Sequence, residues 1–311
     1  MTGANPPRSH PDTSVSVIVC THNPRPDSFA RCLAGLGAQT LSRERWELIV
    51  VDNASTPELA GRPNLAWPAN ARVIAEDRLG LTPARLRGIR EAVGELLVFV
   101  DDDNVLDPDF LETALSVAGE KPFLGSWSGQ CRPEFEQDPP EWTRRYWGNL
   151  VIREFDADVW SNLPRLPATM PCGAGLCVRR EVARQYLHLH ETGARSFDLD
   201  RRGASLMSGG DNDLAACACD VGLGMGLIAS LRLTHLIPRE RLTEEYLSRL
   251  TEGISYSAVV LAHLRRSRDE LQSYAVRWHE PMRALVLRGP HRRIRVASLR
   301  GRRLGLAFVS R

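Results

Sequence analysis

Residues 96–104 read LLVFVDDDN, an uninterrupted apolar run followed by three aspartates and an asparagine. An apolar run without polar alternation is typical of a strand that is buried on both faces, as in a parallel sheet between two layers of helices. Three adjacent carboxylates repel one another, and a bound cation or a solvated edge relieves that repulsion. Because oxygen ligands favour hard ions, the stretch predicts a buried strand that ends at a Mg²⁺ or Mn²⁺ site, or at an ordinary acidic loop.

Three further apolar runs precede this one, at residues 15–20, 46–51 and 71–76, and each predicts a buried strand. Between them, apolar residues at helical spacing predict one helix that Asp27 caps and another that Pro83 opens. Strands that alternate with helices in this way predict an α/β fold with a doubly wound, mostly parallel sheet.

Polar residues stand at the carboxyl ends of three of these predicted strands. They are Thr21, His22 and Asn23 after the first strand, Asp52 after the second, and Asp101, Asp102 and Asp103 after the fourth. In a doubly wound sheet, ligands bind beyond the carboxyl ends of the strands, so we expect these residues to line one shared site. The alternatives are that His22 is a loop histidine without a ligand and that Asp52 only caps the next helix.

The second half of the chain has a less regular pattern. It predicts strands near residues 122–130 and 225–237, an aromatic loop at 131–148, a small-residue turn entering a strand at 172–178, and a long helix capped by Thr243. GGDND at residues 209–213 precedes an apolar helical stretch. Asp211 is therefore either a functional carboxylate at the positive end of that helix or only its cap.

Two further groups of residues have two interpretations each. Trp127, Trp142 and Trp147 either pack in the core or offer aromatic faces to a sugar. Arg201 and Arg202 are either surface residues or contacts for the phosphate of an acceptor.

The composition is that of an ordinary soluble globular protein, with 311 residues of which 43% are hydrophobic and 25% charged. No stretch reaches the ~18–20 apolar residues of a membrane span, and the polar, proline-rich start lacks the apolar core of a signal peptide. The seven cysteines, an odd number, lie largely in apolar surroundings and indicate reduced thiols. These features predict a cytoplasmic protein and exclude collagen-like, coiled-coil and wholly disordered chains.

Charge is distributed unevenly along the chain. The formal net charge is +2, yet residues 283–311 hold nine arginines and no acidic residue. This basic, partly apolar tail predicts peripheral contact with an anionic membrane, at the inner face of the plasma membrane. The alternative is a solvated helix or a loose terminus, and no nucleic-acid partner is expected.

In their order and spacing, four segments resemble the nucleotide-binding half of a family 2 inverting glycosyltransferase with the GT-A fold. They are VSVIVCTHNPRP from Val15, LIVVDNAS from Leu48, GLTPARLRGI from Gly80 and LLVFVDDDNVLDPDFL from Leu96. The acceptor-side and C-terminal segments of the same family resemble CGAGLCVRREV from Cys172, GGDNDL from Gly209 and LTHLIPRERLTEEYL from Leu233. The resemblance to the nucleotide-binding half covers about residues 14–120.

The resemblance implies roles for residues that would contact the nucleotide. Thr21, His22 and Asn23 correspond to the first nucleotide-contacting loop. Asp52 corresponds to the aspartate that hydrogen-bonds the nucleobase, usually uracil, and Arg85 to an arginine near the diphosphate.

Further roles follow for the metal ion and for catalysis. Asp101, Asp102 and Asp103 correspond to the DxD motif, with the first two on the nucleotide sugar and the last on the metal, Mn²⁺ or Mg²⁺. Asp211 corresponds to the catalytic base. His235 stands where some GT-A enzymes have a histidine on the metal or the diphosphate. The alternatives are that His235 is a hydrogen-bonded core histidine and that Arg85 is a surface residue in a salt bridge.

Two positions depart from the family's pattern. Leu86 replaces the asparagine that follows the motif's arginine, and Gly210 replaces the glutamate that usually precedes the base. These losses keep a degraded, non-catalytic binding or scaffold subunit as an alternative. A nucleotidyltransferase is the enzyme alternative, although THNPRP after the first strand has neither Gly nor Lys for a phosphate loop. The absence of GxGxxG there excludes a Rossmann dehydrogenase.

The resemblance implies a metal-dependent, inverting transfer of a sugar from a nucleotide sugar, taken to be UDP-linked, to a hydroxyl of a glycan or lipid-linked acceptor. Bacterial surface polysaccharide or glycoconjugate assembly is the implied setting. We expect five parts: a flexible leader (1–13), a nucleotide-sugar-binding half (14–120), an acceptor-binding and catalytic half (121–240), a C-terminal helical segment (241–282) and the basic tail (283–311).

Overall fold

One sheet of nine strands passes through the part of the chain that the structure describes. This computed structural model describes residues 13–310 except 60–66, 69, 165, 196, 198, 204 and 278. The predicted leader therefore lies, apart from Thr13, outside the described residues. The strands are ordered β3-β2-β1-β4-β8-β6-β9-β5, and β7 pairs with β9.

The first four strands are parallel neighbours. They are β1 (Val15–Thr21), β2 (Trp46–Asp52), β3 (Ala71–Ala75) and β4 (Leu96–Asp101). In register, Thr21 lies opposite Asp52, and Cys20 lies opposite Asp101. The four predicted strands and the α/β class are confirmed, and the strand ends that carry the polar residues meet at one edge of the sheet.

Alternate side chains of β1 pack against different layers of helices. Val15, Val17 and Val19 belong to one buried cluster, whereas Ile18 belongs to another. The first cluster includes α1 (Pro26–Gly37) and α3 (Phe110–Glu120), and the second includes α2 (Leu81–Glu91), α4 (Arg180–Glu191) and α5 (Gly210–Asp220). Burial on both faces explains why the strand's sequence shows no polar alternation.

Two helices begin earlier than the sequence predicts. α1 begins at Pro26, so Asp27 lies in its first turn and is not its N-cap. α2 begins at Leu81 after Gly80, whose φ of 141° is readily adopted only by glycine. Pro83 is the third residue of α2, where its missing N–H costs no helical hydrogen bond.

The second half adds strands of mixed direction. β8 (Leu176–Arg179) is antiparallel to β4, β6 (Leu124–Phe135) is antiparallel to β8, and β9 (Gly224–Ile237) is parallel to β6. The short strands β5 (Asn104–Leu106) and β7 (Val159–Ser161) both pair antiparallel with β9. The sheet is therefore parallel in its first four strands and mixed beyond β4.

The predicted aromatic loop is the largest error in the secondary structure. β6 continues to Phe135, and residues Glu141–Leu150 form a 3₁₀ helix, η3. Trp127 is fully buried, and Trp142 and Trp147 pack in a third cluster with residues of α6 (Glu244–Leu264). Trp127 therefore packs in the core, as one of the two interpretations predicts, whereas Trp142 and Trp147 are partly buried against the third cluster. Shorter 3₁₀ helices are η1 (Arg43–Arg45), η4 (Pro167–Thr169) and η5 (Arg239–Leu242).

The C-terminal segment is helical and begins where the sequence predicts. The Thr243 hydroxyl caps α6 by accepting a hydrogen bond from the Tyr246 N–H at 3.2 Å. The chain continues through α7 (Arg268–Ser273), α8 (His279–Leu285) and α9 (Gly289–Val309).

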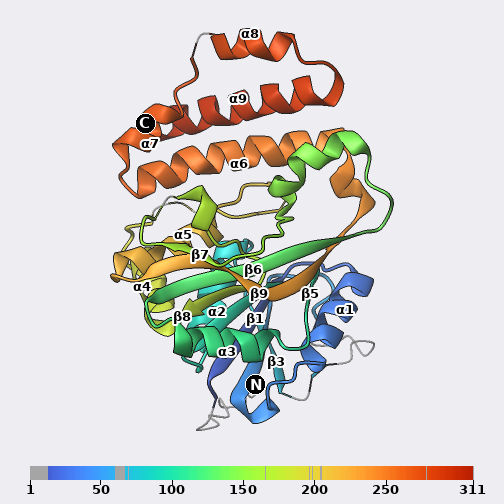
Figure 1. Cartoon of the computed structure of the whole chain (residues 1–311), viewed down its shortest axis with the longest axis vertical. Coiled ribbons are helices and arrows are strands. Elements are labelled where there is room, and N and C mark those ends of the chain that lie inside the picture. Colours follow the sequence, from blue (N-terminus) through green and yellow to red (C-terminus); the bar gives the residue numbers. More distant parts are fainter. Residues whose placement is uncertain are drawn as a thin grey trace.

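The basic tail is not a loose terminus, because α9 lies along α6 at the end of the molecule far from the sheet (Figure 1). Glycine permits the close approach: a Cβ at Gly301 would lie 2.2 Å from the Glu252 carbonyl oxygen. Within the described residues, none of the helices has the length and apolar character needed to cross a membrane.

Candidate active site

A cleft of about 410 Å³ opens at the carboxyl ends of β1 and β4. Every predicted site residue except Asp52 lines it, and residues of the second half, among them Gly173, Asp200 and Arg241, complete its walls. The two halves of the fold therefore meet at one site beyond the carboxyl ends of the strands, where ligands of doubly wound sheets bind.

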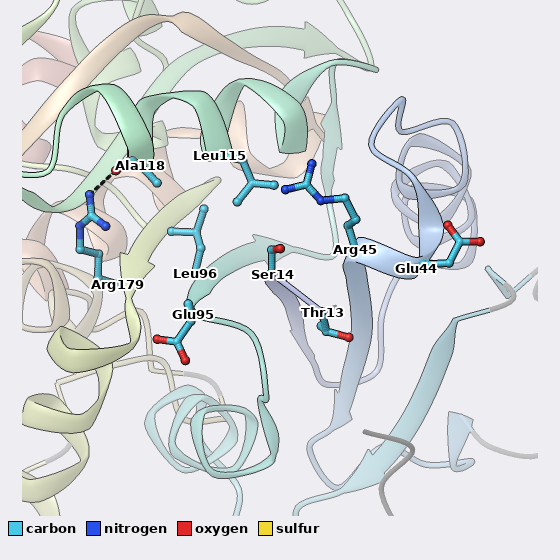
Figure 2. A pocket seen from close by; sticks show the side chains of 9 residues that line it. All are labelled: Thr13, Ser14, Glu44, Arg45, Glu95, Leu96, Leu115, Ala118 and Arg179. Atoms are coloured by element: carbon cyan, nitrogen blue, oxygen red, sulfur yellow. Dashed lines mark hydrogen bonds between the residues drawn. The ribbon is translucent and has the colours of Figure 1, made fainter. Parts of the chain in front are cut away.

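A larger hollow of about 650 Å³ lies at the opposite, amino-terminal end of the strands (Figure 2). Its lining includes Ser14 and Leu96 at the starts of β1 and β4. The guanidinium of Arg179 there donates to the carbonyl oxygens of Ala118 and Leu124, each at 2.6 Å. Ligands of doubly wound sheets bind at the other end, so we place the site in the smaller cleft.

The loop after β1 is tied to the loop after β2. His22 Nδ1 lies 2.7 Å from the Asn53 carbonyl oxygen, and Asn23 Oδ1 accepts a hydrogen bond from the Thr56 N–H at 2.8 Å. The Thr21 hydroxyl, which is buried, donates to the Asp102 carboxylate. These contacts fix the predicted nucleotide-contacting loop against the aspartates.

Asp52 is the predicted site residue that the structure does not bring into the cleft. Its Oδ1 accepts a hydrogen bond from the Ser55 N–H at 3.2 Å, and its Oδ2 accepts from the Leu59 N–H at 2.8 Å. Only 5% of the residue is exposed. The carboxylate thus stabilises the turn after β2. This role resembles the alternative in which Asp52 only caps the helix that follows.

The donor-side carboxylates, Asp101, Asp102 and Asp103, are not equally balanced by positive charge. Burial, followed by the charge of Asp103, raises the pKa of Asp101, and the same two causes raise the pKa of Asp102 to about 7. Burial also opposes ionisation of Asp103, but Arg241 and His235 outweigh it and hold the pKa of that carboxyl well below its usual range. The ionised forms of Asp101 and Asp102 are therefore less well compensated by positive charge than that of Asp103.

Arg241 and His235 surround Asp103. The Asp103 Oδ2 lies 2.7 Å from Arg241 Nη2 and 3.4 Å from His235 Nε2. Arg241 Nη1 lies 3.0 Å from the same imidazole nitrogen, so His235 Nε2 faces both a donor, Arg241, and an acceptor, Asp103. His235 Nδ1 is buried with no hydrogen-bond partner among the described residues.

These residues fit a divalent ion in their chemistry. Unbalanced carboxylates and an imidazole beside Asp103 are suitable donors. The described residues form no group of three or more ligand side chains that could hold a metal by themselves. Mg²⁺ sites of this kind use one or two carboxylates, and the substrate's phosphates and water complete the shell.

The acceptor-side carboxylates, Asp200 and Asp211, face the cleft from the second half. Asp211 is the second residue of α5, whose N-cap is Gly209, so Asp211 is not the cap of its helix. Its Oδ2 instead accepts a hydrogen bond from the Gly173 N–H at 2.7 Å. The carboxylate is held in the first turn of α5, at the positive end of the helix dipole.

Arg85 lies between these groups and is almost completely buried. Its Nη1 donates to the Asp200 Oδ2 at 2.8 Å. Burial opposes the charge of the guanidinium, but Asp200, Asp211 and Asp101 outweigh burial and raise the pKa of Arg85.

Asp213, the other carboxylate near the start of α5, is not among the residues that line the cleft. Arg195 and Arg265 both pair with it, at 2.6 and 2.7 Å. Asp200 and Arg241 were not identified from the sequence. Arg241 lies within the quoted C-terminal segment, but Asp200 lies in a loop without a motif, so no sequence signal marks it.

Comparisons with known proteins agree with this geometry. The profile of the family described as "Glycosyl transferase family 2" matches residues 16–187, which is more than half of the chain. An N-acetylglucosaminyltransferase of Mesorhizobium japonicum is 29% identical over 138 residues, 42% of this chain and 31% of that protein. The glycosyltransferase AglE of Haloferax volcanii is 31% identical over 105 residues, 33% of this chain and 34% of that protein. The chain thus spans about a third of the length of these curated relatives.

Solved structures with the same fold include TarS of S. aureus. TarS 1–349 superposes with a TM-score of 0.51 at 16% identity, covering 95% of this chain and 91% of that one. TarS 1–349 in complex with UDP-GlcNAc gives 0.51 at 15% identity, with the same coverage. At this identity the likeness concerns the fold, and together with the family profile it leads to one conclusion: the chain belongs to glycosyl transferase family 2 and has the GT-A fold.

Proposed function

We propose that the protein transfers a sugar from a UDP-linked donor to a hydroxyl of its acceptor, with inversion at the anomeric carbon and with the help of a divalent ion. One observation carries this proposal: the donor-side carboxylates and Asp211 come from opposite halves of the fold and line a single cleft. A donor and an acceptor bound in that cleft would meet between them.

The donor side suits a diphosphate leaving group. Asp103 and His235 would hold Mn²⁺ or Mg²⁺, and the ion would neutralise charge that develops on the diphosphate, a contribution of several kcal/mol. Arg201 also lines the cleft, and its charge favours the ionised forms of Asp101 and Asp103. The name of the Mesorhizobium relative and the UDP-GlcNAc bound to TarS 1–349 support a UDP-sugar as donor.

Asp211 suits the role of general base. An acceptor hydroxyl is a poor nucleophile, and a carboxylate within hydrogen-bond reach can take its proton. A single carboxylate suffices for direct inversion, because no covalent glycosyl intermediate forms. The Gly173 N–H occupies one oxygen of Asp211 and so fixes the direction of the other.

The proposal is tested by the binding of nucleotide sugars with and without Mn²⁺. In a thermal-shift screen, UDP-sugars and Mn²⁺ together should raise the melting temperature more than either alone, because ligands that bind only the folded state stabilise it. Slow hydrolysis of the preferred donor should accompany binding, which separates an active enzyme from a degraded binding subunit.

Asp103→Ala supplies the matched control for that screen. It should abolish the part of donor binding that depends on Mn²⁺ in a protein that stays folded at the assay temperature, although the loss of Arg241's partner lowers its melting temperature. Equal affinity for UDP with and without metal, in the wild type and the variant alike, would contradict a metal-dependent donor site.

The basic tail supports a second, peripheral element of the proposal: contact with an anionic membrane that carries a lipid-linked acceptor, in surface polysaccharide or glycoconjugate assembly. Leu285 and Val286, which end and follow α8, are 63% and 80% exposed. The side chains of Arg293 and Arg300 on α9 are 79% and 70% exposed. Each arginine near an anionic surface contributes about 1 kcal/mol of attraction.

Substitution tests this contact better than deletion, because α9 covers α6 and its removal would expose the buried face of α6. Leu285→Ser with Val286→Ser should lower co-sedimentation with phosphatidylglycerol vesicles and leave the melting temperature unchanged. Neutral phosphatidylcholine vesicles serve as the control. Equal sedimentation of the wild type with both lipids would contradict an electrostatic contact.

A further inference from the structure

Gly210, the position where the family's glutamate is missing, is covered by the side chain of Asp200. A Cβ atom at Gly210 would lie 2.1 Å from the Asp200 Oδ2 and 2.5 Å from its Cγ. Real Cβ contacts are never this short, so a side chain at position 210 and the observed position of Asp200 exclude each other. The carboxylate of Asp200 thus occupies the space into which a residue at 210 would project.

Asp200 uses both of its oxygens in that position. Oδ2 accepts hydrogen bonds from Arg85 Nη1 at 2.8 Å and from the Thr82 hydroxyl at 2.9 Å. Oδ1 accepts from the Gly210 N–H at 3.1 Å. With 4% of its surface exposed, Asp200 therefore links α2 to the first residue of α5, next to Asp211.

Arg85, which Asp200 holds in place, also lies beside Gly173, as Asp211 does. A Cβ at Gly173 would lie 3.0 Å from Arg85 Nη2 and 3.2 Å from the Asp211 Oδ2. The guanidinium and the carboxylate of Asp211 therefore converge on the same small residue, whose N–H also holds Asp211. The absence of a side chain at Gly173 leaves room for this convergence.

We propose that Asp200 is a positioning residue that supplies, from a separate loop, the carboxylate that position 210 lacks. It holds Arg85 and the start of α5 in place, so that Asp211 keeps its aim at the acceptor. The glycine at 210 is then not a loss of function but the space that Asp200 requires. This inference rests on the proposed function, because it assigns Asp200 to the same site as the base.

The inference is tested by moving the carboxylate back to position 210. Asp200→Ala alone leaves Arg85 buried without its partner and should lower kcat about a hundredfold, the scale expected for a small misplacement of a reacting group. Gly210→Glu alone introduces the clash with Asp200 and should lower both the melting temperature and kcat. The double variant, Asp200→Ala with Gly210→Glu, removes the clash and restores the carboxylate.

The double variant should therefore exceed both single variants in melting temperature and in kcat, with kcat within about tenfold of the wild type. The KM for the donor should change little throughout. Asp220→Ala is the matched control, since Asp220 pairs with Arg265 at 3.2 Å at the far end of α5 and should leave kcat unchanged. Asp200→Asn, which keeps the volume but not the charge, covers the case in which Asp200→Ala does not fold.

Two results would overturn the inference: a double variant no better than the worse single variant in melting temperature, or an Asp200→Asn variant with full kcat. The melting temperatures need no substrate. If the wild type neither transfers nor hydrolyses any UDP-sugar, the proposed function fails, whereas the stability comparison still decides whether the carboxylate at 200 replaces one at 210.

Discussion

The donor-side and acceptor-side carboxylates face one cleft, and each group contains one ion pair with an arginine, which is buried on the acceptor side and partly exposed on the donor side. Asp103 pairs with Arg241 at 2.7 Å, and Asp200 pairs with Arg85 at 2.8 Å. The two groups differ in the surroundings of their other carboxylates. On the donor side, burial and the charge of Asp103 raise the pKa values of Asp101 and Asp102. On the acceptor side, Asp211 is held by a backbone N–H beside Arg85.

This difference indicates that the protein alone fixes the carboxylates of one side, whereas Asp101 and Asp102 on the other side lack a full compensating charge. The acceptor side is complete in the protein alone, because its carboxylates have partners that fix their positions. On the donor side, a divalent ion would supply the missing positive charge when the donor arrives.

The largest effect is expected at the acceptor side. Asp211→Asn keeps the size of the side chain and an oxygen for the Gly173 N–H, but it removes the base. We expect kcat to fall by about 10² to 10⁴ while the donor still binds. Asp220→Asn, at the other end of α5, is the control. Near-normal turnover would place the base elsewhere in the cleft, and Asp213 is poorly suited because two arginines pair with it.

The two arginines should respond differently to metal. Arg241→Met leaves Asp103 without its main partner; a buried pair that loses one member costs about 3–5 kcal/mol, and partial exposure favours the lower value. Mn²⁺ should recover part of this loss, because it can replace the positive charge beside Asp103. Arg85→Met should be at least as destabilising, and Mn²⁺ should not recover it. Chemical denaturation with and without Mn²⁺ measures both, and equal recovery would remove the distinction between the two sides.

Each side was predictable in part: the sequence indicated the three aspartates on the donor side and Asp211 and Arg85 on the acceptor side, but neither Arg241 nor Asp200. Asp101, Asp102 and Asp103 are consecutive residues at the end of a buried strand. The carboxyl ends of parallel strands meet at one edge of the sheet, so the sequence places these aspartates correctly. His235 was indicated by the resemblance alone, and the structure places it opposite Asn104 in the β5–β9 register. Asp200 and Arg85 are 115 residues apart, and their contact depends on the path of a loop that no motif or periodicity encodes.

Asp52 shows a different reason for a failed placement. Its position at the end of β2 was predicted correctly, but its orientation depends on the turn that follows. Two backbone N–H groups of that turn each bond one oxygen of the carboxylate and so orient it into the turn, and the sequence does not reveal these local contacts.

A smaller effect is expected from Asp52→Asn, which separates the observed contacts from the nucleobase contact that the resemblance implies. The amide offers one acceptor oxygen where the carboxylate offers two, so one of the N–H groups of Ser55 and Leu59 loses its partner. We expect a loss of stability of about 1–3 kcal/mol and a donor KM close to that of the wild type. A large rise in the donor KM with unchanged stability would show that Asp52 turns toward the nucleobase when the donor binds.

The smallest effect on turnover is expected at Cys20, which stands between the two groups. Burial raises the pKa of this thiol to about 12, with Arg85 lowering it and Asp101, Asp200 and Asp102 raising it further. Cys20 is half-buried at the wall of the cleft, and a thiol that stays protonated is inert, so Cys20→Ala should change kcat by less than about threefold.

The alkylation rate of the Cys20 thiol measures whether water reaches the space between the two carboxylate groups. At pH 8 a pKa of about 12 leaves a thiolate fraction of about 10⁻⁴, against about a quarter for an ordinary cysteine, so alkylation should be about a thousandfold slower than that of glutathione. The rate should rise about tenfold per pH unit between pH 7 and pH 10, because only the thiolate reacts. Mass spectrometry of the Cys20 peptide after timed exposure to iodoacetamide measures it. If Cys20 reacts as fast as glutathione at pH 8, water reaches the space between the groups, and burial can no longer account for the unbalanced charge on the donor side.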